Sequence, residues 1–277
     1  MTRVTNTLRP PDVHRTPQRR RRRRIALTLI VTALLLLAAA GAGIWWFFRG
    51  DAPAEVDLET AAASAQVEDA TTSDTAAASE ASTSPEAASA ASSIAGTWSV
   101  DTSVGEFNYE NSTGTFVGFR VEEELSGIGS TTAVGRTPSV SGTVTIEGTT
   151  LTAVTIDADL TAITTNDSRR DDEVQDALET SNYPTASFVL TEPIEFGDAA
   201  ATGQTVTVDA VGELTIHGVT RTVTIPLEAQ LVDGTIVIVG STTITFSDYG
   251  VSVPAAPIVI SAEDAGTLEL QLFLQHS

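Results

Sequence analysis

The chain has 277 residues, no cysteine, no lysine and a formal net charge of −21. The absence of cysteine excludes disulfides, thiolate chemistry and cysteine-ligated metals. After residue 50, all but one of the 36 acids stand against only five arginines. That part of the chain therefore repels nucleic-acid phosphates and has to gain its stability from an apolar core.

The first 48 residues have the pattern of a membrane anchor. A basic arm with nine arginines occupies residues 1–24, and residues 25–48 carry no charge. As a helix, the uncharged stretch is about 36 Å long at ~1.5 Å per residue, enough for a hydrocarbon core of about 30 Å. We therefore predict one transmembrane helix, Ile25-Phe48. The positive-inside rule places the basic arm in the cytoplasm and the rest of the chain outside it, on a single-pass protein of the cell membrane.

Two alternatives to this anchor remain. An arginine run can bind nucleic acid, but directly before an apolar span the positive-inside rule explains it more simply, so no nucleic-acid partner is expected. A cleaved signal peptide would use the small residues Ala38-Ala39-Ala40. Apolar sequence continues well beyond them, which favours a retained anchor.

Residues 49–93 consist mainly of Ala, Ser, Thr and Glu, with almost no large apolar side chain. Such a composition cannot form a core, so we predict a disordered linker, with transient helix in stretches such as Ala76–Ala78 as the alternative. A free coil of about 43 residues has a root-mean-square reach on the order of 35 Å. The following domain, residues 94–277, would then move freely above the membrane.

The stretch from Thr205 to Phe246 is the most informative part of that domain. It contains three alternating apolar runs, separated by His217-Gly218 and Asp233-Gly234. If each pair is a two-residue hairpin loop, every apolar position meets an apolar position, whereas a slip by one residue would set that face against water. The stretch is therefore predicted to be a meander with one apolar side. That side is either filled by its own side chains or holds a ligand.

Other alternating runs surround this meander, at residues 115–121, 139–146, 151–160, 185–190 and 267–274. Glu147-Gly148-Thr149 is predicted to form a three-residue turn, because the faces on either side match only if the loop has an odd number of residues. Ser168 followed by Asp171 resembles a capping box, which predicts one short helix that ends before Pro184. We predict an all-β fold, an antiparallel lipocalin-like barrel or a sandwich. The long strands favour the barrel.

Three segments resemble the YceI-like family of polyisoprenoid-binding, lipocalin-like proteins. They are GELTIHGVTRTVTIPL (212–227), NDSRRDD with NYPTASF (166–188) and FSDYGVS (246–252). The resemblance implies an exported β-barrel with an elongated apolar cavity for isoprenoid lipids or other long amphiphiles. Two departures stand out: Thr102-Ser103 follow Asp101, where family members often have a histidine, and residues 170–174 read Arg-Asp-Asp-Glu-Val instead of Arg-Asp-x-His-Leu. Any contact that those histidines make is absent from this chain.

Catalytic and metal-binding motifs are not found in the sequence. His217 lies in a predicted turn and His276 lies next to the last residue. Neither has the neighbouring ligand or titratable side chains that a metal site or an acid–base pair requires. General acid–base catalysis also needs a pocket and a shifted pKa, which acidic runs on a solvated surface do not indicate. We predict a protein that is not an enzyme, with no metal and no cofactor.

Arg221 is the sharpest candidate for a binding residue. In the predicted register it lies on the apolar face, opposite Leu214 and Phe246, where a charge has to be paired or lie at a rim. It either forms an ion pair with Asp248 or contacts the phosphate or carboxylate head group of an amphiphile. Arg136 and Arg169 are weaker candidates of the same kind. The apolar residues expected to line the cavity are Phe119, Val121, Val144, Ile156, Phe188, Leu214 and Phe246.

The sequence thus predicts a membrane-anchored, extracytoplasmic binding protein for an isoprenoid or another amphiphilic lipid, used in carriage, storage or protection. The alternative is a filled barrel that acts as a structural or interaction module at the cell surface. Alternation does not separate the two, because a packed core and a lined cavity give the same pattern.

Overall fold

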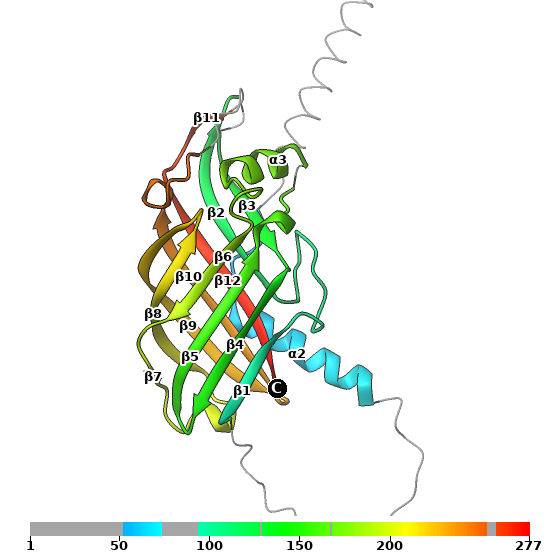
Figure 1. Cartoon of the computed structure of the whole chain (residues 1–277). Helices are drawn as coiled ribbons and strands as arrows, with labels where there is room; N and C mark the ends of the chain where they lie inside the picture. The colour runs from blue at the N-terminus through cyan, green and yellow to red at the C-terminus, as the bar shows by residue number, and fades with distance from the viewer. Residues whose placement is uncertain (1–51, 74–93, 128, 167, 254–258) are drawn as a thin grey trace, which may run out of the picture. The chain divides into compact units, whose positions relative to one another are not determined.

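A computed structural model describes residues 52–73, 94–127, 129–166, 168–253 and 259–277 (Figure 1). The basic arm and the predicted transmembrane segment, residues 25–48, lie outside these ranges. Within them, no helix has both the length and the apolar character needed to span a membrane.

The described residues form twelve strands, two α-helices and three short 3-10 helices. The helices are α2 (Leu58–Ser73), η1 (Leu160–Ala162), α3 (Ser168–Ala177), η2 (Ala200–Thr202) and η3 (Phe246–Tyr249). The strands are β1 (Gly96–Asp101), β2 (Phe116–Leu125), β3 (Gly129–Thr137), β4 (Val140–Glu147), β5 (Thr150–Asp159), β6 (Thr185–Leu190), β7 (Ile194–Glu195), β8 (Val206–Ile216), β9 (Val219–Val232), β10 (Thr235–Thr245), β11 (Val259–Ala262) and β12 (Ala265–His276).

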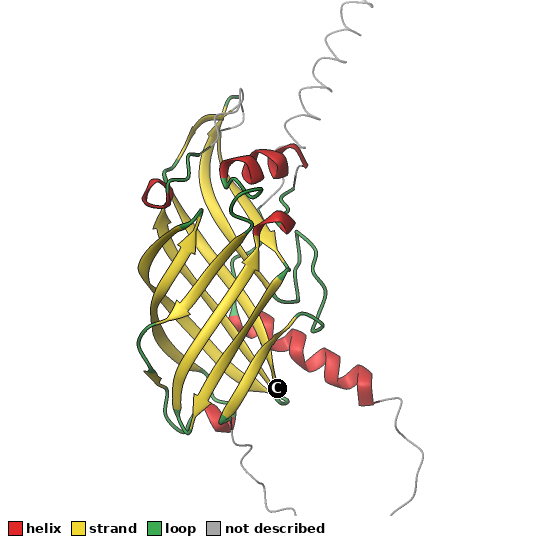
Figure 2. Cartoon of the chain, viewed as in Figure 1, coloured by secondary structure: helices red, strands yellow, loops and turns green. Residues whose placement is uncertain are grey.

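Eight of the strands close a ring of antiparallel pairs (Figure 2). The order around the ring is β1, β4, β5, β6, β8, β9, β10 and β12, and β12 pairs with β1 again. Strand β1 uses only the last residues of β12, and β2 pairs with the preceding part, Thr267 to Gln271. The prediction of an all-β antiparallel barrel is confirmed.

The turn chemistry of the meander sets its register as predicted along β8 and β9, and between β9 and β10 as far as Leu227 and Gly240; the expected pairing of Ile225 with Thr242 is not formed. His217 and Gly218 have φ values of 52° and 72°, and Asp233 and Gly234 have 48° and 90°, as a two-residue loop of type I′ requires. As a result Ile216 pairs with Val219 and Leu231 with Ile236, both as expected.

The predicted turn between β4 and β5 is wrong in detail. Glu147 already pairs with Thr150, so the loop holds two residues, and the register shifts next to Thr145 and Ile146. The odd residue that the matching faces require therefore lies in a β-bulge instead of the loop. Beyond the bulge Val144 still faces Val154.

Two apolar clusters close the inside of the barrel at opposite ends. One lies where β9 turns into β10 and includes Trp98, whose indole Nε1 donates to the carbonyl of Ile94 at 2.9 Å. The other lies where β8 turns into β9 and includes Tyr249, Ile216 and Leu178. We call the space that the ring encloses between these ends the lumen.

The predicted disordered linker is wrong for Leu58–Ser73, which form α2, so the domain carries two helices instead of one. Leu58, Ala61, Ala62 and Ala65 are buried against the outside of the barrel, on Val104, Val232, Val237, Val239 and Phe273. The prediction counted large apolar side chains, but this contact needs small ones because the barrel supplies the bulk. A chain docked in this way is also not the free coil of the predicted reach.

Helix α2 begins at a cap. The carboxylate of Asp57 accepts from the amide of Thr60 at 2.9 Å, and this hydrogen bond is the main reason that the pKa of Asp57 lies below its usual value. The predicted helix after residue 166 is confirmed as α3. Its Asp171 carboxylate accepts from the amide of Thr165 at 2.6 Å.

Candidate ligand-binding lumen

Four of the predicted site residues form one continuous row across the inner wall. Ile156 on β5 pairs with Phe188 on β6, Phe188 pairs with Leu214 on β8, and Leu214 pairs with Arg221 on β9. These residues are far apart in the sequence and meet because each hairpin fixes the register of the next strand. The register therefore brings the predicted aromatic, aliphatic and cationic positions together.

The other predicted residues lie on neighbouring parts of the same wall. Val144 faces Val154 on one side and Trp98 on the other, and Phe119 pairs with Leu268. Val121 is buried beside Ala133 of β3. Phe246 lies at the start of η3 and packs with the cluster around Tyr249.

Many apolar side chains on the inner face keep exposed surface, although they point into a closed ring. In a filled core such side chains would be buried by close packing. The barrel's own side chains therefore leave part of the lumen accessible. The partly exposed residues are Val117, Phe119, Val154, Ile156, Phe188, Val223, Leu227, Leu231, Ile238, Leu268 and Leu270.

The three predicted lining phenylalanines are held flat against the wall by glycines. A Cβ atom at Gly135 would clash with the ring of Phe119, one at Gly212 with Phe188, and one at Gly266 with Phe246. Each ring thus covers a glycine of a nearby strand, a known way of protecting glycine in a sheet. Each ring therefore contributes apolar surface to the inner wall beside its glycine.

Arg221 lies at the exposed end of the inner row. Its pairing with Leu214 is confirmed, but the β9–β10 ladder ends at Leu227 and Gly240, so the expected pairing with Phe246 is not formed. No ion pair between Arg221 and Asp248, both described, is found. The guanidinium donates to the carbonyl of Thr220 at 3.5 Å.

Tyr249 is a buried polar neighbour of Arg221. The residue is only 2% exposed, and no hydrogen-bond partner of its hydroxyl is found among the described residues. Burial raises the pKa of Tyr249, and the positive charge of Arg221 partly opposes that rise. The end of the lumen near Arg221 therefore combines an exposed cation with a neutral phenol.

His217 joins three segments at the same end of the barrel. Its Nδ1 lies 3.2 Å from the carbonyl oxygen of Tyr249, and its Nε2 lies 3.5 Å from a carboxylate oxygen of Glu179. The ring of Tyr183 contacts it edge-on at 4.6 Å between centroids. Across the described ranges, no three side chains of His, Asp or Glu are grouped closely enough to hold a metal ion. The geometry assigns His217 to the turn, as expected.

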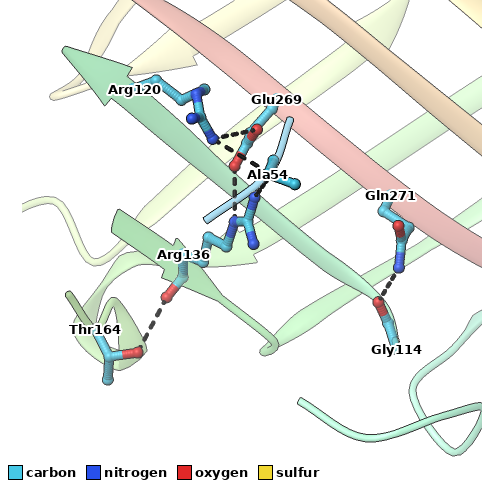
Figure 3. A network of polar contacts seen from close by, with 7 residues as sticks. All are labelled: Ala54, Gly114, Arg120, Arg136, Thr164, Glu269 and Gln271. Atoms are coloured by element: carbon cyan, nitrogen blue, oxygen red, sulfur yellow. Dashed lines mark hydrogen bonds and ion pairs between the residues drawn. The ribbon is translucent and has the colours of Figure 1, made fainter. Parts of the chain in front are cut away.

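A buried ion network on the outer wall was not predicted (Figure 3). Arg136 donates from Nε to the carboxylate of Glu269 at 2.7 Å, and the two residues are only 3% and 2% exposed. Arg120 approaches the second oxygen of that carboxylate at 3.5 Å. The carbonyl of Ala54, just before α2, accepts from Arg136 Nη2 at 2.8 Å.

This network corrects the expectation that Arg136 is a head-group candidate like Arg221, because Arg136 does not face the lumen. It lies in β3 on the outer face, with its guanidinium 4.3 Å from the centre of the Phe116 ring. It reaches Glu269 across Gly118, where any side chain would clash with it. Arg169 belongs to α3, and its side chain is not among those described.

A signal for this covered outer face was present in the sequence. Residues 236–239 read IVIV, which is apolar on both faces of β10, and Phe273 stands on the otherwise polar face of β12. An unbroken apolar run is typical of a strand buried on both sides. The run indicates a cover, although it does not say which segment supplies it.

Comparison with known proteins adds a family and several solved structures. A family model described as YceI-like domain matches residues 98–274. A polyisoprenoid binding domain from Saccharophagus degradans, implicated in plant cell wall breakdown, is 19% identical, with a TM-score of 0.47 over 65% of this chain and 98% of that one.

Two further structures are similar at the same level. BcnA of Burkholderia cenocepacia is 20% identical, with a TM-score of 0.44 over 57% of this chain and 95% of that one. A YceI protein of Campylobacter jejuni is 16% identical, with a TM-score of 0.39 over 50% of this chain and 82% of that one. No curated protein matches the chain.

Proposed function

The chain belongs to the YceI-like family, and we propose that its barrel binds an isoprenoid or another long amphiphilic lipid in the lumen, for carriage, storage or protection. One observation carries the proposal: the inner wall is apolar, yet its side chains keep exposed surface inside a closed ring. Burial of a lipid chain against that wall contributes roughly 25 cal/mol for each Å² removed from water. This role needs binding and no catalysis.

The head group of the lipid is proposed to lie at Arg221. A phosphate or carboxylate there would gain a charged partner, because Arg221 is exposed and stands at the end of the inner row. Replacement of Arg221 by alanine is expected to weaken binding of an anionic amphiphile more than that of a neutral one of equal chain length. Equal losses for both would contradict the head-group role.

A single-pass anchor and an extracytoplasmic barrel remain part of the proposal. Their support is the sequence alone, in which a basic arm precedes an uncharged stretch long enough to cross a bilayer. Protease treatment of intact cells or spheroplasts tests the topology. The barrel should be digested while a tag at the N-terminus stays protected.

The lipid itself is tested by solvent extraction and mass spectrometry of the full chain purified in detergent. Ile156→Trp places a large side chain in the lumen, whereas Thr155→Trp places the same side chain on the exposed outer face of β5. A lumen lipid should be lost from the first variant and kept by the second. If the wild type and both variants yield the same lipids, those lipids do not lie in the lumen, and the proposal fails.

A further inference from the structure

The first half of strand β9, residues 219–226, is paired on one side only. From Val219 to Ala229 the strand pairs residue by residue with β8. Its ladder with β10 covers Thr235 to Gly240 and ends at Leu227. Residues 219–226 of β9 and 241–245 of β10 therefore face each other without a ladder. We call this boundary the seam.

Pro226 explains why the ladder ends there. Continuation of the register would place Pro226 opposite Ser241, but proline has no amide hydrogen to donate to the carbonyl of Ser241. Proline is largely restricted to edge strands for this reason. Pro226 lies inside a 14-residue strand of the ring. Its presence there indicates that residues 219–226 of β9 form an edge.

Side chains satisfy the carbonyls at this edge in place of a neighbouring strand. The hydroxyl of Thr242 on β10 donates to the carbonyl of Thr224 at 3.0 Å. Nη1 of Arg221 donates to the carbonyl of Thr220 at 3.5 Å. Rotation of two side chains breaks both bonds, whereas a continuous ladder would have to unzip cooperatively.

The seam leads directly to the apolar interior. Val223 and Ile225 face inward on one side of it, and Ile244 and Phe246 do so on the other. The two ends of the barrel are less suited to entry, because buried clusters around Trp98 and Tyr249 close them. A long apolar chain can pass the seam sideways along the edge of the cluster around Tyr249, to which Val223, Ile244 and Phe246 belong, and leave the cluster around Trp98 undisturbed.

We propose that the seam between β9 and β10 is the entrance through which the apolar chain of a lipid moves sideways into the lumen, with its head group left beside Arg221. The inference rests on the proposed function, since it assumes a lipid in the barrel. The inference adds a route of entry to that function. Pro226, Thr224 and Thr242 control this route, because they determine how the seam is hydrogen-bonded.

A reversible disulfide tests the route, and the chain has no cysteine to interfere. In the full chain, Thr224→Cys with Thr243→Cys bridges the seam from its outer face, where both residues are exposed. The matched control is Thr215→Cys with Thr220→Cys, because these threonines already face each other across the paired β8–β9 boundary, with hydroxyls 2.8 Å apart. The probe is a pyrene-labelled fatty acid presented in phosphatidylcholine vesicles.

Oxidation of the seam variant should slow uptake of the probe by about tenfold, with the final amount bound unchanged, and a reductant should restore the rate. The control disulfide should leave the rate within about twofold of wild type. Uptake at the wild-type rate through a bridged seam would overturn the inference. Pro226→Thr supplies the missing amide donor and should also slow uptake, even if the disulfide does not form.

Absence of uptake in the wild type would contradict the proposed function. Hydrogen exchange of the ligand-free chain then tests the seam by itself. In a strand, the amide and carbonyl of one residue point to the same side, so the amides of Thr222 and Thr224 face the seam, and those of Val223 and Ile225 face β8. Hydrogen exchange should be faster at the first pair, and Pro226→Thr should slow it. Equal protection of both pairs would rule out an entrance here.

Discussion

Where α2 covers β10 and β12, these strands carry apolar side chains on both faces, and the covered outer side chains are the less exposed ones. On the outside, Val237 and Phe273 are 0% exposed because α2 covers them. On the inside, Ile238 and Leu270 of the same strands keep exposed surface. At these positions the usual order of a small barrel, with a packed inside and a solvated outside, is reversed, whereas Leu272 and Leu274 near the Trp98 end are buried on the inside.

The difference teaches what each face is for. The outer patch is covered by a segment of the same chain, Leu58 to Ala65, and that cover continues into the ion network at Ala54. The inner wall has no such cover from the described residues and carries one exposed cation at its end. The outer face is built for stability, and the inner face is left open for another molecule.

Phe273→Ala should have the largest effect on the free energy of unfolding, a loss of about 3–5 kcal/mol, because it leaves a cavity between α2 and the barrel. Leu270→Ala on the inner face should cost less than half as much, since Leu270 is already partly exposed. Denaturant unfolding of both variants measures the comparison. A larger loss for Leu270→Ala would show that the lumen is the packed side.

Glu269→Gln should have the next largest effect and lower the free energy of unfolding by about 3 kcal/mol, because it leaves the buried guanidinium of Arg136 without its carboxylate. Combination with Arg136→Met should cost less than the sum of the two single changes, since the second change removes the unpaired charge. The coupling energy comes from a double-mutant cycle. Simple additivity would mean that the two side chains do not act as a pair.

Ala61→Glu should cost about 1–2 kcal/mol by forcing a carboxylate into the contact between α2 and β10, where Ala61 is 1% exposed. Ala63→Glu, on the exposed side of the same helix, is the matched control. Limited proteolysis should cut α2 rapidly in the first variant only. Equal resistance of both would break the comparison, because the outer face would then not depend on its cover.

The meander was predictable because the chemistry of its turns is local. His217-Gly218 and Asp233-Gly234 carry the backbone preference of their turns in two residues each, so the register could be counted from them. That register gave the pairing of Leu214 with Arg221, whereas alternation within the other runs gave only a face for Ile156 and Phe188 and not their pairing in one row. Family membership agrees with the three motifs quoted from the sequence.

Features that depend on distant partners were not predictable in the same way. The contact of α2 depends on alanines, which stabilise the helix only through the barrel surface that they meet. The sequence around Arg136 contains no carboxylate that predicts a buried ion pair. Its partner Glu269 lies 133 residues away, and no local pattern links the two side chains. The bulge between β4 and β5 was also misplaced, because matching faces fix the number of residues but not where the extra one lies.

The smallest expected effect concerns two tyrosines, one for each face. Burial raises the pKa of Tyr249 near the lumen and of Tyr109 near the outer ion network, so each phenol keeps its proton longer in the folded chain than in the unfolded one. Folding stability should therefore fall as the pH rises above about 10, the ordinary tyrosine pKa, and Tyr249→Phe should reduce that fall. An anionic lipid bound at Arg221 would offset the positive charge that lowers the pKa of Tyr249. Spectrophotometric titration should then show that Tyr249 ionises at a higher pH when lipid is added, with no change for Tyr109. A shift of Tyr109 alone would mean that the anion binds to the outer face instead of the lumen.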